Sequence, residues 1–300
     1  LTVTGVQTCA LPILPTPFTA VNLLLSFTAI VANTLILVAL GKVSSIRAPT
    51  KLLFRFLAII DLCVGLVSLP LGVVVFDFQQ IREVKVNVYQ NIYRVHIIST
   101  FVLSEISKVI STLISIDRVL ALSLVWKYRH VTLKRVRTLL ICLFCTRFVL
   151  TVPCFIRQDY LMYPPIFFTF FLLSMFGALL TSVSCYVKIF LKLKENQTHV
   201  RNIGSQDQTA GSLLNVTRYK KTVSSIAWIQ LALLVCFLPF GTLCVGHLVL
   251  RLEYSVDLWR VVTLYLYLNA TLNPLLLCWK IADFKRATRD TIENVCCFCR

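Results

Sequence analysis

The chain has 300 residues, of which 57% are hydrophobic and only 14% are charged, and its mean hydropathy is +0.80. A soluble domain is about one-quarter charged, so this composition excludes an ordinary soluble protein and predicts a helical protein that crosses the membrane several times. The net charge of +17 could suggest a nucleic-acid partner, but the basic residues lie in short segments between apolar runs, so none is expected.

Seven apolar runs of membrane length occupy most of the chain. Residues 1–13 resemble a translated sequencing adapter, so we predict that they are an artefact outside the fold. The membrane domain is predicted over residues 14–280, and residues 281–300 are predicted to form an amphipathic helix and a cysteine-rich tail. The spans are predicted at residues 18–40, 52–76, 89–122, 138–155, 165–191, 222–248 and 258–279.

Loop charge predicts the orientation of these spans. Most of the 30 lysines and arginines follow the first, third, fifth and seventh spans. By the positive-inside rule those segments face the cytoplasm, which leaves the N-terminus outside the cell and the C-terminus inside. The longest connection, residues 194–219, is polar and is expected to be a mobile cytoplasmic loop.

The last span contains the most costly polar residues. Asn269 and Asn273 are four residues apart and share one helix face, and Pro274 removes a backbone donor beside them. Amides at such a position are costly in a membrane unless neighbouring helices or water satisfy them. We therefore expect this stretch to have a function beyond anchoring.

A polar stripe with helical period runs along the third span. Its members are Thr100, Ser104, Ser107, Ser111, Ser115 and Arg118. Such a stripe faces the interior of a bundle, although close helix packing alone would also explain the serines. Glu105 and Lys108 are spaced to form a self-compensating ion pair, and an alternative is that Lys108 competes with a cation at Asp61 in the second span.

Several short motifs occur in a highly specific order and spacing. They are Asn33, L-A-I-I-D at residues 57–61, D-R-V at 117–119, Tyr186, F-L-P at 237–239, N-P-L-L-L at 273–277 and Phe284. With these motifs, residues 18–296 resemble rhodopsin-like (class A) G-protein-coupled receptors. The resemblance implies an all-α bundle of seven transmembrane helices followed by a short cytoplasmic amphipathic helix.

The resemblance also implies a function. A plasma-membrane receptor of this kind passes an extracellular ligand signal to a heterotrimeric G protein by outward movement of its sixth span, with arrestin and membrane lipid as further partners. Apart from a sodium ion, no cofactor is expected. The residues implied in switching and G-protein coupling are Asp117, Arg118, Tyr186, Phe237, Pro239, Asn273, Pro274 and Leu277, with Arg118 held by Asp117 at rest.

Three further groups of residues have expected roles: the first two follow from the same resemblance, and the third follows from its position after the amphipathic segment. The implied sodium pocket comprises Asn33, Asp61, Ser107, Asn269 and Asn273, with Asp61 as the charged ligand. The candidates for ligand binding are His96, Thr100, His247, Tyr265 and Tyr267. The candidates for lipidation are Cys296, Cys297 and Cys299.

The chain also departs from the family pattern. The usual outer disulfide is missing, because its third-span position is Tyr93 and residues 156–164 contain no cysteine. Ala178 replaces a proline, Phe237 a tryptophan and Leu277 a tyrosine, which puts the efficiency of coupling in question. The missing disulfide and proline are similar to the pattern of melanocortin, cannabinoid and lysophospholipid receptors.

That pattern favours a lipid-like or peptide ligand over an amine. Thr100 stands where aminergic receptors carry an aspartate, and Tyr267 stands where opsins carry the retinal lysine. No nucleophile–base or metal constellation is present, so an enzyme is not expected. A non-signalling seven-span receptor or scaffold remains an alternative, and a transporter or channel is less favoured because the sequence shows no internal repeat.

Overall fold

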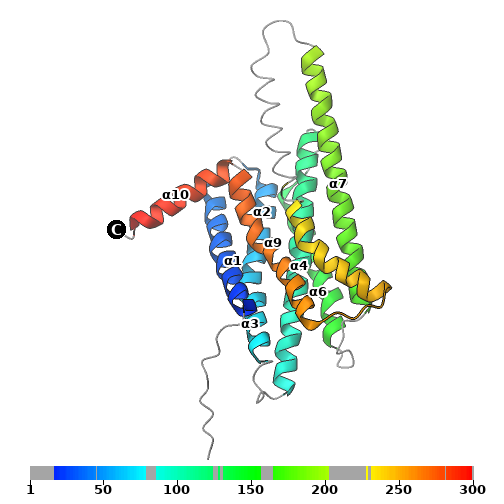
Figure 1. Ribbon diagram of the computed structural model, residues 1–300. Coiled ribbons are helices and arrows are strands. Elements are labelled where there is room, and N and C mark those ends of the chain that lie inside the picture. The colour runs from blue at the N-terminus through cyan, green and yellow to red at the C-terminus, as the bar shows by residue number, and fades with distance from the viewer. Residues whose placement is uncertain are drawn as a thin grey trace, which may run out of the picture.

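The computed structural model describes residues 17–44, 46–78, 86–123, 128, 131–156, 165–202, 228, 231–280 and 282–298. Every regular element in these ranges is helical. Figure 1 shows long helices running side by side, with one shorter helix leaving the bundle at a steep angle near its C-terminal end. The chain is therefore an all-α helix bundle, as its sequence predicts.

The bundle helices follow the predicted spans closely. They are α1 (Pro17–Lys42), α2 (Ala48–Cys63), η1 (Val64–Ser68), α3 (Leu69–Phe78), α4 (Val86–Ser123), α6 (Leu133–Ile156), α7 (Pro165–Asn202), the helix Leu231–Val249 and α9 (Val256–Lys280). The elements α2, η1 and α3 form one continuous span, so these helices make a bundle of seven. Helix α4 is central, because it contacts α2, α3, α6, α7 and α9.

Five of these spans are long and apolar enough to cross a membrane by length and composition alone. They are Pro17–Lys42, Ala48–Phe76, Val86–Ala121, Leu231–Val249 and Val256–Trp279. Helix α7 contributes a shorter apolar stretch, Thr169–Cys185. Helix α6 is less apolar because it contains the basic residues Lys134, Arg135, Arg137 and Arg147.

The second span contains an irregularity that the sequence did not reveal. The segment η1 is a π-helical turn that begins three residues after Asp61. A Cβ atom on Gly65 would lie 3.1 Å from side-chain atoms of Ala29 and Ile30, so glycine lets this turn approach α1 closely. The Ser26 hydroxyl of α1 donates a hydrogen bond to the Gly65 carbonyl at 2.7 Å.

One helix is longer than expected, and one short helix matches its prediction. A loop was expected from residue 194, but helix α7 continues to Asn202. The reason is that lysine, glutamate and glutamine, which occur in this stretch, extend a helix readily. Helix α10 (Ala282–Phe298) is the predicted amphipathic helix. It is fixed to the bundle by Phe284, whose ring packs edge-on against Phe54 at 5.5 Å, and by Lys42, which donates to Thr291 at 3.0 Å.

Candidate functional site

A hydrogen-bonded polar group joins α2, α4 and α9 in the middle of the bundle, and we call it the Asp61 site. One carboxylate oxygen of Asp61 accepts a hydrogen bond from the Ser107 hydroxyl, and the other accepts one from the Asn273 amide, both at 2.8 Å. The Asn269 amide donates to the Ser107 hydroxyl at 3.0 Å. All four side chains are buried, so the structure brings together four of the five residues expected at a sodium pocket.

The fifth residue, Asn33, lies beside this group without touching the carboxylate. Its amide nitrogen donates to two backbone carbonyls, Ala29 in α1 at 2.8 Å and Ala270 in α9 at 3.0 Å. Asn33 holds α1 against α9, next to a helix turn whose backbone Pro274 weakens, and its membership of the sodium pocket stays a prediction.

The Asp61 site has oxygen atoms to spare. Asn269 Oδ1 and Ser111 Oγ are buried without a hydrogen-bond partner. Ser111 lies one helical turn beyond Ser107 on α4, so both hydroxyls share a face. The donors to Asp61 are an amide and a hydroxyl, both neutral, and burying an ionised carboxylate without a cation is costly. Unused oxygens around an uncompensated carboxylate suit a hard cation such as sodium.

A second polar group lies at the C-terminal end of α4, where Asp117 meets α2 and the segment after α4. Asp117 accepts hydrogen bonds from the Thr50 hydroxyl and the Tyr128 phenol, both at 2.8 Å. These two hydroxyls also lie 3.0 Å from each other. Tyr128 was missed at the sequence level, because nothing in the basic segment around it distinguishes one aromatic residue from a membrane-edge anchor.

Arg118, which is expected to be held by Asp117 at rest, makes another contact in this structure. The structure describes both residues of the D-R pair and shows no ion pair between them. The Arg118 guanidinium instead lies 5.5 Å from the centre of the Phe54 ring. Asp117 is satisfied by neutral hydroxyl donors, and Arg118 by an aromatic face.

The environment of Tyr128 fixes its protonation. Burial raises the pKa of the Tyr128 phenol and is the largest cause; the hydrogen bond with Thr50 lowers the pKa, the nearby Asp117 carboxylate raises it, and Arg118 lowers it slightly. The phenol therefore stays protonated at neutral pH and remains a donor to Asp117. Arg47 adds to the same group, with its guanidinium 4.3 Å above the Tyr128 ring.

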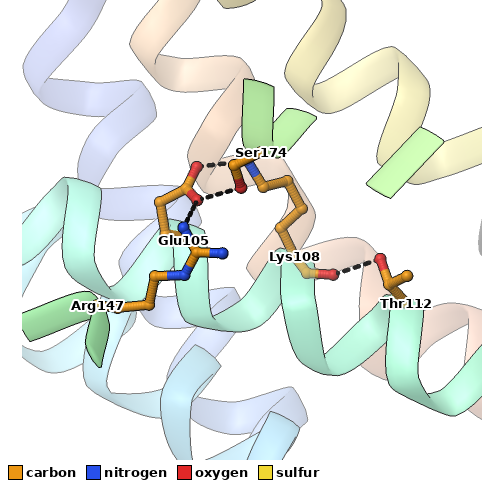
Figure 2. A network of polar contacts seen from close by, with 5 residues as sticks. All are labelled: Glu105, Lys108, Thr112, Arg147 and Ser174. Atoms are coloured by element: carbon orange, nitrogen blue, oxygen red, sulfur yellow. Dashed lines mark hydrogen bonds and ion pairs between the residues drawn. The ribbon is translucent and has the colours of Figure 1, made fainter. Parts of the chain in front are cut away.

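A third polar group is ionic and lies where α4 faces α6 and α7 (Figure 2). Lys108 and Glu105 form the ion pair expected from their spacing. Glu105 also accepts a hydrogen bond from Ser174 of α7 at 2.7 Å, and Arg147 of α6 lies 3.4 Å from its carboxylate. We call these four residues the Glu105 cluster. The self-compensating pair is thus real, and two residues from other helices extend it.

The family of the chain follows from a comparison with known proteins. The model of the 7 transmembrane receptor (rhodopsin family) matches residues 32–277. The chain belongs to this receptor family. It is therefore a G-protein-coupled receptor that crosses the membrane several times, and its family is not one of enzymes.

The receptor is also similar along nearly its whole length to curated proteins. It is 23% identical to adenosine receptor A3 of Bos taurus, with 98% of this chain and 95% of the relative covered. It is 24% identical to adenosine receptor A3 of Ovis aries, with coverages of 94% and 91%. Its identity to adenosine receptor A2b of Gallus gallus is 21%, with coverages of 94% and 90%.

The candidate ligand-binding residues of the receptor divide into two groups. Thr100 of α4 and Tyr267 of α9 are fully buried and share a hydrogen bond at 2.7 Å. His96 is also buried, with Nδ1 3.1 Å from the Ser68 carbonyl. Tyr265, by contrast, is 36% exposed, and His247 lies 3.2 Å from the Leu252 carbonyl beyond the helix end. Among these five residues, Thr100 and Tyr267 are in direct contact, and a shared ligand pocket stays a prediction.

The switch residues of the receptor lie in apolar surroundings. Leu277 is buried in the same core cluster as Phe54 and Phe284, so the position where the family carries a hydroxyl is apolar here. Phe237 lies in a second core cluster with Phe171 and Phe240. Pro239 and Pro274 lie within the helices of the sixth and seventh spans.

Some predicted residues fall outside what the structure describes. The side chain of Tyr186 lies outside the described residues, as do those of the lipidation candidates Cys296, Cys297 and Cys299. The predicted adapter-derived stretch, residues 1–13, lies outside them as well.

Proposed function

We propose that this receptor converts binding of an extracellular ligand into activation of a heterotrimeric G protein by outward movement of the helix Leu231–Val249. The observation that carries this proposal is the Asp61 site. It joins α2, α4 and α9 through Asp61, Ser107 and Asn273. The site lies beside the turn of α9 in which Pro274 lacks a backbone N–H donor. A polar linkage at a weakened helix turn can adopt two arrangements without disrupting the surrounding core.

The Asp61 site is also proposed to bind a sodium ion. Asp61 would supply the charge, and the oxygens of Ser107, Ser111 and Asn269 would supply neutral ligands. A bound ion would stabilise the arrangement in which α2, α4 and α9 are closely joined, because it interacts with oxygens of all three helices at once. Sodium would then oppose activation by binding more tightly to this arrangement.

The proposed orientation puts the N-terminus outside the cell and α10 at the cytoplasmic face of the plasma membrane. Basic residues gather at α1, α6, α7 and α10, and this supports the orientation because positive charge favours the cytoplasmic side. The amphipathic α10 would lie along the inner membrane surface, with lipid as its partner and lipidation expected at Cys296, Cys297 and Cys299. Arrestin is a further expected partner of the cytoplasmic face.

The ligand is proposed to lack an essential amine. Thr100 pairs with the Tyr267 phenol, so this part of the bundle offers two neutral hydroxyls rather than a carboxylate. A lipid-like or peptide ligand is favoured on the missing disulfide and proline, and the similarity to adenosine receptors adds a nucleoside to the compounds to be tested.

The proposal is tested by measuring GTPγS binding to a panel of Gα subunits in membranes that contain the full chain. The ligand panel contains adenosine, lysophospholipids, peptides and amines. Arg118→Ala should abolish basal and ligand-driven activation at equal surface expression. Arg286→Ala, which removes an exposed arginine from α10, is the matched control and should retain activation.

A non-signalling scaffold is the second candidate, and one observation favours it. Leu277 is 3% exposed and lies among apolar side chains, so it offers no hydrogen bond where the family has a tyrosine. Absence of activation with every Gα subunit and ligand would favour the scaffold. Activation that is unaffected by Arg118→Ala would contradict the proposed coupling mechanism.

A further inference from the structure

Lys108 is an unusual residue for the centre of a membrane bundle, because its side chain is fully buried with 0% exposure. It lies on α4, the central helix, and a lone cation at this depth is costly. Its ion pair with Glu105 explains part of how the charge is tolerated, but Glu105 has other partners as well. Ser174 donates to one of its oxygens, and Arg147 brings a second positive charge close to the same oxygen.

The Glu105 cluster therefore holds two cations and one carboxylate (Figure 2). Arg147 can reach the bundle surface, since 16% of its side chain is exposed, and its guanidinium also lies 5.2 Å from the Phe170 ring. Lys108 has no such route. Its ammonium must find its remaining stabilisation within the bundle.

Aromatic rings from two other helices supply that stabilisation. The Lys108 ammonium lies 4.5 Å from the ring centre of Phe171 in α7 and 5.3 Å from that of Phe237 in the helix Leu231–Val249. Both distances are within the range of a cation–π interaction, which strengthens where water is excluded. The two rings are 6.5 Å apart and inclined by 31°, so one ammonium can interact with both.

The position of Phe237 gives this contact a consequence for movement. Phe237 precedes Pro239 by two residues, and Pro239 cannot donate the backbone hydrogen bond that would stiffen the helix there. Bending at this point displaces Phe237 relative to α4. Because Lys108 is fixed to Glu105 on α4 itself, the displacement separates its ammonium from the Phe237 ring.

We propose that Lys108 is a positioning residue for the sixth span: its ammonium holds Phe237 against α4 and α7, and so stabilises the receptor with the helix Leu231–Val249 closed. The inference rests on the proposed outward movement of that helix. It gives Lys108 a role distinct from competition with sodium, because the ammonium contacts Glu105, Phe171 and Phe237, whereas Asp61 is bonded by Ser107 and Asn273.

The receptor contains a natural reporter for this helix. Trp228 precedes the described part of the sixth span, and its ring centre lies 5.4 Å from that of Trp279 near the end of α9. Outward movement of the cytoplasmic half of the sixth span would separate the two rings. The test therefore follows the ¹⁹F NMR signal of Trp228 in full-length receptor that carries 5-fluorotryptophan, assigned by Trp228→Phe.

Two variants separate positioning from charge compensation. Lys108→Met removes the cation, and Glu105→Gln/Lys108→Met/Arg147→Met removes all three charges of the Glu105 cluster, so that none of them is left alone. Both variants should increase the population of the displaced Trp228 signal by about thirtyfold, the change that corresponds to loss of a desolvated cation–π contact. If Lys108 only neutralised Glu105, the triple variant would match the wild type, and that result would overturn the inference.

Thr112→Val is the matched control. The Thr112 hydroxyl donates to the Lys108 carbonyl at 3.0 Å, so this variant alters the same helix turn but leaves the ammonium and the rings in place (Figure 2). It should leave the Trp228 signal as in the wild type. In a Phe237→Leu background, Lys108→Met should have less than about a twofold effect, because the contact is already lost.

Addition of purified heterotrimeric G protein separates failure of this inference from failure of the proposed function. If G protein displaces the Trp228 signal but the Lys108 variants do not, Lys108 does not position the helix, and the receptor mechanism stands. If neither G protein nor any variant displaces the signal, the outward movement itself is wrong, and the role of Lys108 is wrong with it.

Discussion

Two carboxylates buried inside the bundle differ in how their charge is balanced. Asp61 is bonded by a hydroxyl and an amide, Ser107 and Asn273, and both are neutral. Glu105 is bonded by the Ser174 hydroxyl and has two cations beside it, Lys108 and Arg147. Both carboxylates are buried, so only their partners distinguish them.

The difference separates a site that can exchange a ligand from one that holds the structure. A carboxylate with neutral donors still attracts a mobile cation, whereas the charge of a carboxylate paired with two cations is already compensated. The Asp61 site should therefore respond to ions in the medium. The Glu105 cluster should respond only to mutation, since its cations are covalently part of the protein.

Removal of the Glu105 charge is expected to have the largest effect on stability. Glu105→Gln leaves Lys108 and Arg147 without their carboxylate, and an uncompensated buried charge costs about 3–5 kcal/mol. The thermal unfolding of receptor in lipid nanodiscs measures this loss. Glu293→Gln is the matched control, because Glu293 is 58% exposed and its pair with Arg289 on α10 is a surface pair. Equal stability of the two variants would contradict the comparison.

Asp117 offers a third case, a buried carboxylate that accepts hydrogen bonds from two hydroxyls at the C-terminal end of α4. Tyr128→Phe removes one of its two hydroxyl donors and should lower the free energy of unfolding by about 1.5–3 kcal/mol, the usual range for a hydrogen bond to a charged group. Tyr265→Phe, at an exposed phenol on α9, should change it far less. If the two variants unfold at the same temperature, Asp117 does not depend on Tyr128.

The sodium response sharpens the comparison directly. Sodium at ten times its dissociation constant should stabilise the receptor against unfolding by about 1.4 kcal/mol, relative to the same concentration of choline. Asp61→Asn should remove this difference, while Asp257→Asn should retain it, because Asp257 is 73% exposed and far from the ion. A sodium effect that persists in Asp61→Asn would exclude the Asp61 site.

Ser174→Ala is expected to have the smallest effect. It removes one neutral donor from Glu105 but leaves both cations, so the free energy of unfolding should fall by only about 1 kcal/mol. The measurement is again thermal unfolding in nanodiscs, with Thr181→Ala as control, since the Thr181 hydroxyl bonds only within α7 at an exposed position. A loss as large as that of Glu105→Gln would mean that Ser174, rather than the cations, stabilises the carboxylate.

The sequence predicted most of the fold because its signals are strong ones. Membrane-length apolar runs define the spans, and Asn269 and Asn273 share a face that Asp61 and Ser107 meet in the structure. The spacing of Glu105 and Lys108 likewise predicted their ion pair. These predictions succeed because periodicity within one helix, together with the cost of burying polar groups, restricts which faces turn inward.

The remaining features depend on contacts between helices, which spacing within one helix does not fix. Arg147 and Ser174 reach Glu105 from α6 and α7, and the rings of Phe171 and Phe237 meet at Lys108 from two further directions. Asp117 accepts hydrogen bonds from Thr50 and Tyr128 and not from its neighbour Arg118, because adjacent residues on a helix point in different directions.

The π-helical turn η1 also affects how the faces of the second span are counted. A turn of this kind accommodates one more residue than an α-helical turn, so every side chain beyond Ser68 is rotated by about 100° from the position that uninterrupted counting would give. Gly72 and Phe76 lie in that rotated part, next to His96. Faces counted from Asp61 with the α-helical period therefore fail beyond η1, and the outer half of this span has to be mapped from the three-dimensional structure.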